Sequence, residues 1–501
     1  MHLIVIEEEA DAMHALGARP GPDRGKAGTA LPRDGHDGLQ RATYGLTCEN
    51  MGNKIAASPA PESGIGRILV NVAWLLGGKG FGAVCSLAYL AILSRSLGLK
   101  DFGHFSLIFA TGQALVAIAG FQTWQAVVRY GAAHIHEGNE ARFGRLVMLA
   151  GAIEWLGALS GCLVAFVVFY GFGSTLDLNP AYVDMAFAFN CALLWARVSA
   201  PTGVLRAIDR FDLSVYVEAV VPTGRLIAAT AIWLTGPTIG RFLFAWAAID
   251  LLSAVLYWFT ARRASPASVR LRYLAQWRTA LAENSGAARF IGIVYAGSAL
   301  TAVYQQGPLL AVGYWLGTSA AGVYRLADQL MQGFGKLSVL ATRAVYPEIT
   351  RARVAQAHSE FRRLVLRVSL MTGVGGVIVV AFAALLGEQL LTLVGGSEFE
   401  RGAVVLVPLA IAASFGLGSV AYEPLLHSTG HARYGLIARF LTILVTLGGI
   451  LALAGYGPIG IAWAVTAGGA VGYLAMGLFG WGSLRFVARE ERHSRAMETA
   501  Q

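Results

Sequence analysis

Long apolar stretches separated by short polar breaks follow one another from about residue 65 to residue 482. Many of them are close to the ~20 residues that an α-helix needs to cross the ~30 Å hydrocarbon core of a membrane. We therefore predict an all-α polytopic membrane protein with about twelve transmembrane helices, six in each half of the chain. The predicted spans are residues 67–93, 105–128, 146–171, 183–204, 214–234, 240–260, 288–313, 320–342, 364–386, 403–425, 434–454 and 459–482.

Two short segments recur at nearly the same spacing. Residues 97–105 read LGLKDFGHF and residues 316–324 read LGTSAAGVY, an offset of 219 (316 − 97), and both lie between long apolar runs. The sequence GPTIG at 236–240 corresponds to GPIG at 457–460, an offset of 221 (458 − 237). Two matches at nearly one offset suggest a chain built twice. Because six spans are an even number, the two lobes should form a parallel repeat about an axis along the membrane normal.

The polar segments divide the chain further. Arginine-rich segments fall on one side of the predicted spans, which the positive-inside rule assigns to the cytoplasm together with both termini. The polar, Gly- and Pro-containing start of the chain lacks helical periodicity and should be disordered, and Met51 is an alternative start. The expected units are a tail at 1–63, a first lobe at 64–260, a cytoplasmic linker at 261–287, a second lobe at 288–482 and a cytoplasmic tail at 483–501.

The composition agrees with a membrane protein and argues against a soluble protein, a nucleic-acid-binding protein and an enzyme. Only 14% of the residues are charged and the mean hydropathy is +0.56, whereas soluble domains carry roughly 25% charged residues. The net charge of +9 lies mostly in short segments between apolar runs, so positive-inside orientation explains it and nucleic acid is not an expected partner. The basic linker is instead expected to lie against anionic membrane lipids. The four cysteines form no CxxC pair, and no Walker A, HExxH or GxSxG motif occurs, so we expect no catalytic residue, metal or cofactor and no enzyme.

Ionisable residues inside the predicted spans are the candidate functional residues. Such side chains are costly at membrane depth and normally face a cavity or a partner. The basic set is in excess, and a positively charged cavity between the lobes would attract an anion such as phosphate. The basic residues are Lys79, Arg197, Arg225, Arg325, Lys336 and Arg439, with Arg289 near a span end, and the acidic residues are Glu154, Glu218, Asp250 and Asp328.

Spacing places some of these residues on common helix faces. Arg325, Asp328, Gln332 and Lys336 are three, four and four residues apart and form one polar stripe. An equally weighted alternative is that Arg325 with Asp328, and Glu218 with Arg225 or Arg197, are ion pairs that only lock helices together. Lys79 has no acid within helical reach on its own span, which favours a functional role for it.

Residues 94–107, SRSLGLKDFGHFSL, preceded by Asn71 and Lys79, resemble the Wzx-type polysaccharide flippases of the multidrug/oligosaccharidyl-lipid/polysaccharide exporter superfamily. In that family a first span with a basic residue ends in an Arg-x-Leu-Gly turn with an acidic-Phe-Gly step. Residues 316–330, LGTSAAGVYRLADQL, are similar to the family's seventh and eighth spans but lack the acidic-Phe step. The resemblance covers residues 65–486, and the matching positions of the first hairpin are Arg95, Leu97, Gly98, Asp101, Phe102 and Gly103.

The resemblance implies a V-shaped pair of six-helix lobes around a cavity in the bacterial inner membrane. An undecaprenyl-diphosphate-linked oligosaccharide would pass from the cytoplasmic to the periplasmic leaflet by alternating access. A polysaccharide polymerase or ligase complex is then a candidate partner. The candidate substrate-binding residues are Lys79, Arg289, Arg325 and Lys336, then Arg197 and Arg225, with Gln113 and Gln332 for sugar hydroxyls, and the candidates for proton or sodium coupling are Asp328, Asp250, Glu154 and Glu218.

Three alternatives differ in testable features. A cation-coupled multidrug antiporter of the same superfamily should have a cavity that leans acidic, whereas this one leans basic. A lipid II flippase should have two further spans. A membrane polysaccharide polymerase or ligase should carry a large extracytoplasmic loop, and the loops on that side are short.

Overall fold

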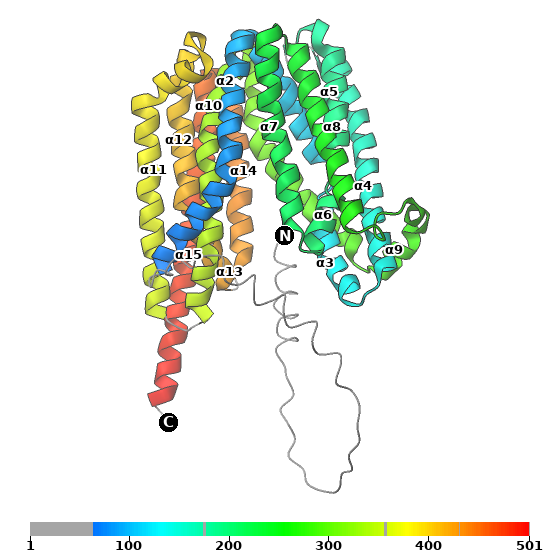
Figure 1. The fold of residues 1–501 in the computed structure, drawn as a ribbon. Helices are drawn as coiled ribbons and strands as arrows, with labels where there is room; N and C mark the ends of the chain where they lie inside the picture. Colours follow the sequence, from blue (N-terminus) through cyan, green and yellow to red (C-terminus); the bar gives the residue numbers. More distant parts are fainter. Residues whose placement is uncertain (1–63, 174–176, 355–357, 430, 500–501) are drawn as a thin grey trace, which may run out of the picture.

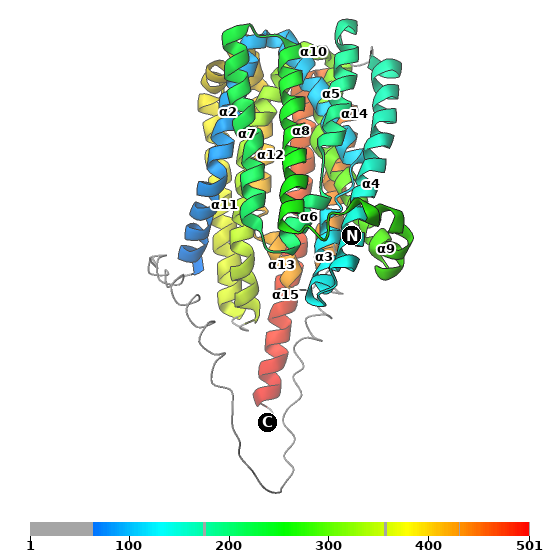
Figure 2. The ribbon, with the colours of Figure 1, turned by 45° about the vertical axis from the view of Figure 1, so that its right-hand side comes forward.

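The computed structural model describes residues 64–173, 177–354, 358–429 and 431–499. The predicted tail at 1–63 lies outside the described residues. All regular structure in the described ranges is helical, and the long helices run side by side in one bundle (Figures 1 and 2). The all-α membrane fold is thereby confirmed.

The first half of the chain supplies one group of helices. It consists of α2 (Gly64–Ala119), α3 (Trp124–His136), α4 (Glu140–Phe166), the π-helical turn η1 (Val167–Gly171), η3 (Pro180–Tyr182), α5 (Val183–Ala196), α6 (Ala200–Ala207), α7 (Phe211–Thr235) and α8 (Ile239–Ala264).

The second half follows a connection that contains η4 (Leu271–Gln276) and α9 (Trp277–Glu283). It consists of α10 (Ala287–Val354), α11 (His358–Gly395), η5 (Ser397–Gly402), α12 (Ala403–Gly418), α13 (Tyr422–Ser428), α14 (Ala432–Leu453), η6 (Ala454–Tyr456) and α15 (Pro458–Thr499). In Figure 1 the helices from α11 to α15, yellow to red, gather on one side of the bundle and those from α4 to α8 on the other.

The two longest helices, α2 and α10, are hairpins. Each contains one non-helical residue: Gly98 with φ 71° and ψ 176°, and Gly317 with φ 82° and ψ 178°. These conformations lie at positive φ, which glycine adopts without the clash that a Cβ would cause. The two glycines are related by the same offset of 219 (317 − 98), so the structure repeats the turn that the sequence repeats. We call the end of the bundle that carries both turns the hairpin end.

Ten helical stretches in the described residues are long and apolar enough to cross a membrane. The longest are Gly82–His136 with 55 residues and Ala287–Gly333 with 47, and each contains a hairpin glycine. The outside of the bundle exposes many large apolar side chains, as expected of a surface that faces lipid. Examples are Leu163, Leu234, Phe244, Leu385 and Leu451, each more than 70% exposed.

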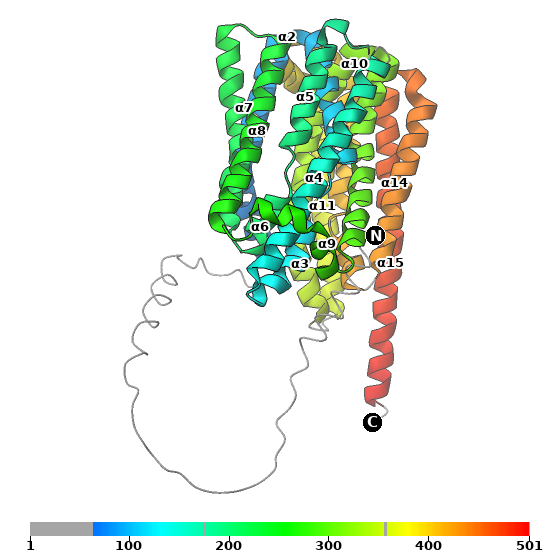
Figure 3. The same ribbon diagram turned by 90° about the vertical axis from the view of Figure 1, so that its right-hand side faces the viewer.

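Three predicted spans are interrupted where single helices were expected. The span at 105–128 breaks between Ala119 and Trp124, the span at 183–204 between Ala196 and Ala200, and the span at 403–425 between Gly418 and Tyr422. Pro201 and Pro424 follow two of these breaks, and a proline lacks the N–H that a continuous helix would need there. The short segments α3, α6 and α13, together with α9, lie at the end opposite the hairpin turns (Figures 1 and 3).

Candidate functional site

A cavity of about 1160 Å³ lies between the two halves of the chain. Its walls include the break in the second predicted span and the break between α5 and α6. Irregular backbone at membrane depth is tolerated where it is buried in protein or lines a water-filled cavity. The residues that the argument uses are Gln113, Phe121, Gln122, Trp124, Gln125, Arg197, Ser199, Arg206, Glu218, Arg225 and Asp250 from the first half, and Ser298, Thr301, Gln305, Gln306, Arg439 and Phe440 from the second.

Basic side chains outnumber acidic ones on the cavity wall. Among the described residues, four arginines line it, Arg197, Arg206, Arg225 and Arg439, against two acids, Glu218 and Asp250. The described part of the wall therefore carries two formal positive charges more than negative ones. Such a surface favours an anionic group and disfavours an organic cation.

The internal ion pair of the cavity differs from the predicted one. Arg225 contacts Asp250 of the neighbouring helix α8, with Nη2 2.8 Å from Oδ2. Glu218, expected as the partner of Arg225 or Arg197, instead lies 3.9 Å from Arg206. The guanidinium group of Arg206 also lies over the ring of Trp124, 4.2 Å from its centroid.

Neutral hydrogen-bonding side chains complete the wall. Five glutamines line the cavity: Gln113, Gln122, Gln125, Gln305 and Gln306. Of these, sequence reasoning selected only Gln113, although the adjacent pair at 305 and 306 within an apolar run was a visible signal. Amide groups both donate and accept hydrogen bonds, which suits the hydroxyl groups of a sugar.

Glu154 holds the two helix breaks of the first half together. Its carboxylate accepts hydrogen bonds from the hydroxyl of Thr123 and from the backbone N–H groups of Ser199 (3.0 Å) and Ala200 (2.7 Å). The hydroxyl of Ser199 in turn accepts from the backbone N–H of Trp124, at 2.9 Å. Glu154 therefore satisfies the first N–H groups of α6, which have no partner within the helix.

A second polar cluster lies on α10. The side chain of Gln332 donates to Asp328 at 2.7 Å, as their four-residue spacing predicts. The guanidinium of Arg325 lies 5.7 Å from the ring centroid of Phe109, and that of Arg225 lies 5.4 Å from the same ring. One aromatic ring thus lies between an arginine of each half.

The remaining predicted residues are spread over other places. Arg289 is exposed in the first turn of α10, and neither Arg289 nor the cluster at Arg325, Asp328 and Gln332 is among the residues that line the cavity. The side chains of Lys79 and Lys336 lie outside the described part of the structure. The cavity therefore brings together Gln113, Arg197, Arg225, Arg439, Glu218 and Asp250 from the candidates named in the sequence, and Arg206 joins them.

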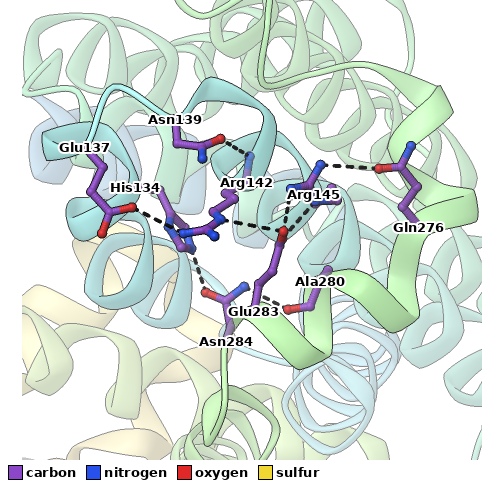
Figure 4. A network of polar contacts seen from close by, with 9 residues as sticks. All are labelled: His134, Glu137, Asn139, Arg142, Arg145, Gln276, Ala280, Glu283 and Asn284. Carbon is purple, nitrogen blue, oxygen red and sulfur yellow. Dashed lines mark hydrogen bonds and ion pairs between the residues drawn. The ribbon is translucent and has the colours of Figure 1, made fainter.

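A polar network fastens the connection between the halves to the first half (Figure 4). Arg145 of α4 donates to both carboxylate oxygens of Glu283, at 2.8 and 2.5 Å, and His134 contacts Asn284 at 2.9 Å. The hydrogen bond from Arg145 holds the pKa of Glu283 below its usual value. The second half therefore starts from a fixed point beside α3 and α4.

The bundle, its paired hairpins and the cavity between the halves give a fold similar to that of solved transporters of the multidrug/oligosaccharidyl-lipid/polysaccharide (MOP) exporter superfamily. An inward-facing multidrug resistance transporter of the MATE family superimposes with a TM-score of 0.67 at 14% identity, covering 81% of this chain and 96% of that one. The lipid II flippase MurJ in an inward closed conformation superimposes with a TM-score of 0.59 at 11% identity, covering 83% and 90%.

The family follows from the sequence comparison. Residues 68–353 match the family described as polysaccharide biosynthesis protein, and the chain belongs to this family. The inner membrane protein YghQ of Escherichia coli (strain K12) is 25% identical over 334 residues, covering 66% of this chain and 93% of that protein. The resemblance inferred from the two hairpin segments is thus confirmed at the level of the family, and the fold is similar to that of solved MOP-superfamily transporters.

Proposed function

We propose that this transporter flips an undecaprenyl-diphosphate-linked oligosaccharide from the cytoplasmic to the periplasmic leaflet of a bacterial inner membrane. The observation that carries the proposal is the inter-half cavity with its excess of arginines and its five glutamines. A diphosphate needs cations, a glycan needs neutral hydrogen-bonding groups, and a polyprenyl tail can stay in lipid. The polymerase or ligase that uses the glycan would receive it on the periplasmic side.

The topology fits this task. Each of the two longest membrane stretches reverses at its hairpin glycine, so we count two crossings in each and twelve crossings in total. With six crossings per half, the halves form two lobes related by a parallel repeat. The positive-inside rule applied to the arginine-rich segments favours a cytoplasmic location for both termini and for the end that carries α3, α6, α9 and α13. The cavity then faces the leaflet in which the substrate is made.

Within the cavity we assign roles by position. Arg197 from the first half and Arg439 from the second both line the cavity and are the leading candidates for the diphosphate, and Gln113 is a candidate for the glycan. Arg206 and Arg225 each lie within ion-pair distance of an acid, at 3.9 Å from Glu218 and 2.8 Å from Asp250, and would contribute less free charge. Glu218 and Asp250 remain the acids placed to couple transport to a cation, because they line the cavity.

The alternative within the superfamily is a multidrug antiporter. An antiporter of organic cations needs a cavity with acidic groups free to bind them, whereas one of the two acids on this wall already neutralises Arg225 at 2.8 Å. Among lipid-linked substrates, lipid II is the competing assignment, and its flippase would be expected to have two further spans.

The test is translocation of a fluorescent undecaprenyl-diphosphate oligosaccharide in proteoliposomes. Arg439→Ala should lose at least about tenfold in rate, because one lost charge-assisted hydrogen bond changes binding by this order. Arg433→Ala is the matched control, since Arg433 is exposed on the same helix and stacks on Tyr434, and it should transport normally. If the native chain moves a lipophilic cation and ignores the lipid-linked glycan, the proposal is wrong.

A further inference from the structure

Two carboxylates cross between the halves of the chain at the hairpin end. Glu398 of η5, in the second half, accepts a hydrogen bond from the backbone N–H of Leu99 in the first hairpin, at 2.9 Å. Asp177, in the first half, accepts from the backbone N–H of Thr318 in the second hairpin at 3.2 Å and from its hydroxyl at 3.3 Å. Each half thus contributes a carboxylate that holds the hairpin of the other half.

The two contacts are equivalent in the repeat. Leu99 and Thr318 are related by the offset of 219 (318 − 99), and each directly follows a hairpin glycine. Asp177 and Glu398 are related by an offset of 221 (398 − 177), and they lie in the connections that follow α4 with η1 and α11, respectively. The contact occurs twice, from different local sequences and in opposite directions between the halves. This repetition indicates that it belongs to the repeated architecture of the two halves.

The same end is closed by close packing between the halves. A Cβ on Gly322 would lie 2.9 Å from the carbonyl oxygen of Leu99, so the two hairpins meet backbone to backbone. Phe102 packs edge to face against Phe399, with ring centroids 5.5 Å apart. Arg95 donates to the carbonyl oxygens of Thr392 and Leu393 at the end of α11, where the helix dipole favours a cation.

The strength of the crossed contacts suits a reversible closure. Both carboxylates are exposed, so they can exchange the backbone N–H groups for water. A hydrogen bond to a charged acceptor contributes more than a neutral one, yet less than it costs to break a buried ion pair.

We infer that Asp177 and Glu398 are a pair of crossed latches, positioning residues that hold the hairpin end shut while the cavity is open at the other end. To open the hairpin end, the transporter must release Leu99 and Thr318 together, because each latch ties one hairpin to the opposite half. The inference rests on the proposed transport function only in requiring that both ends open in turn. The contacts themselves do not depend on which substrate is moved.

The experiment measures the distance between the hairpins directly. Lys100 and Ser319 are exposed, one on each hairpin, and stand at equivalent repeat positions (319 − 100 = 219). Spin labels on Lys100→Cys and Ser319→Cys, with the four native cysteines replaced, report their separation by pulsed electron paramagnetic resonance. The native latches should give mainly one short distance. Asp177→Ala with Glu398→Ala should raise the ratio of long to short distances by about tenfold or more.

Matched controls separate latching from loss of charge. Glu400→Ala removes an exposed carboxylate from the same short helix as Glu398, and Asp184→Ala removes one that bonds Tyr170 within its own half. Both should keep the short distance. The Asp177→Asn and Glu398→Gln pair, which keeps an acceptor oxygen, should give an intermediate ratio and serves if the alanine pair does not fold.

Two results overturn the inference: an unchanged distance in the double variant, or an equal change in the controls. No substrate is needed for this measurement. The double variant could open the hairpins while the native protein fails to move a lipid-linked glycan. That combination would reject the proposed substrate and still support the latches.

Discussion

Gly103 and Gly322 meet where the two hairpins cross, and a Cβ built on Gly322 would lie 3.2 Å from the backbone nitrogen of Gly103. The two glycines occupy equivalent repeat positions, at the offset of 219 (322 − 103). A Cβ on Gly103 would in turn clash with the carbonyl oxygen of Thr318. The closure of this end therefore depends on two positions without side chains.

Gly103→Ala should destabilise the closed transporter. The added methyl group meets backbone atoms, which cannot rotate away, and overpacking of this kind costs about 1–3 kcal/mol. Thermal unfolding of the purified protein should show the lower midpoint. Gly333→Ala is the control, because a Cβ there meets no heavy atom within 4 Å and alanine favours the helix. Equal midpoints for native protein and Gly103→Ala would contradict this account of the hairpin contact.

Arg225→Ala should be strongly destabilising, since it leaves Asp250 without its ion-pair partner. The two side chains are only 10% and 12% exposed, and removing one partner of a buried pair costs about 3–5 kcal/mol. Arg225→Met with Asp250→Leu should recover most of that loss in thermal unfolding. If the double variant is stable but does not transport, the pair has a role in transport beyond fixing α7 to α8. If the double variant is as unstable as Arg225→Ala, the unpaired carboxylate of Asp250 is not the cause of the instability.

Glu154→Ala should unfold the region around the two helix breaks. It leaves the hydroxyl of Thr123 and the N–H groups of Ser199 and Ala200 without an acceptor, at a cost of about 3 kcal/mol or more. Glu140→Ala, an exposed acid in the first turn of the same helix, should have little effect. Because Glu154 was also a candidate for ion coupling, Glu154→Gln should be assayed for transport at several proton gradients. Altered gradient dependence in a stably folded Glu154→Gln would show that capping is not its main role.

The sequence predicted the features that repeat. The two LG turns appear as Gly98 and Gly317 with nearly identical backbone angles, and the intramembrane arginines led to the cationic cavity. A periodic apolar pattern and an internal repeat are local signals, so one sequence suffices to read them.

The sequence did not predict which charged side chains form ion pairs in the cavity. Arg225 and Glu218 share a helix face, but seven residues along a helix span about 10.5 Å, too far for a hydrogen bond. The true partner, Asp250, lies on the next helix and depends on packing. The breaks near Gly120 and Pro201 were also missed, because an apolar run looks the same whether or not its backbone is interrupted.

Protonation of Glu283 should weaken the attachment of the connection between the halves. Its pKa is lowered by the hydrogen bond from Arg145, so the stabilisation is present above the unfolded pKa of about 4.3. It is lost as the pH falls through the lower pKa of the folded state. Glu283→Gln should therefore cost about 1 kcal/mol near pH 6, and the difference from the native protein should shrink below about pH 4.

Thermal unfolding between about pH 3 and pH 7 checks this last prediction, because the quantity of interest is a difference between two proteins at each pH. Glu137→Gln is the matched control, since Glu137 belongs to the same network but its side chain is 53% exposed and lies 3.5 Å from Arg142. A constant difference between native protein and Glu283→Gln over the whole range would mean that the charge of Glu283 does not hold the connection. In that case the hydrogen bonds between His134 and Asn284 and between Arg145 and Gln276 would be the next attachments to test.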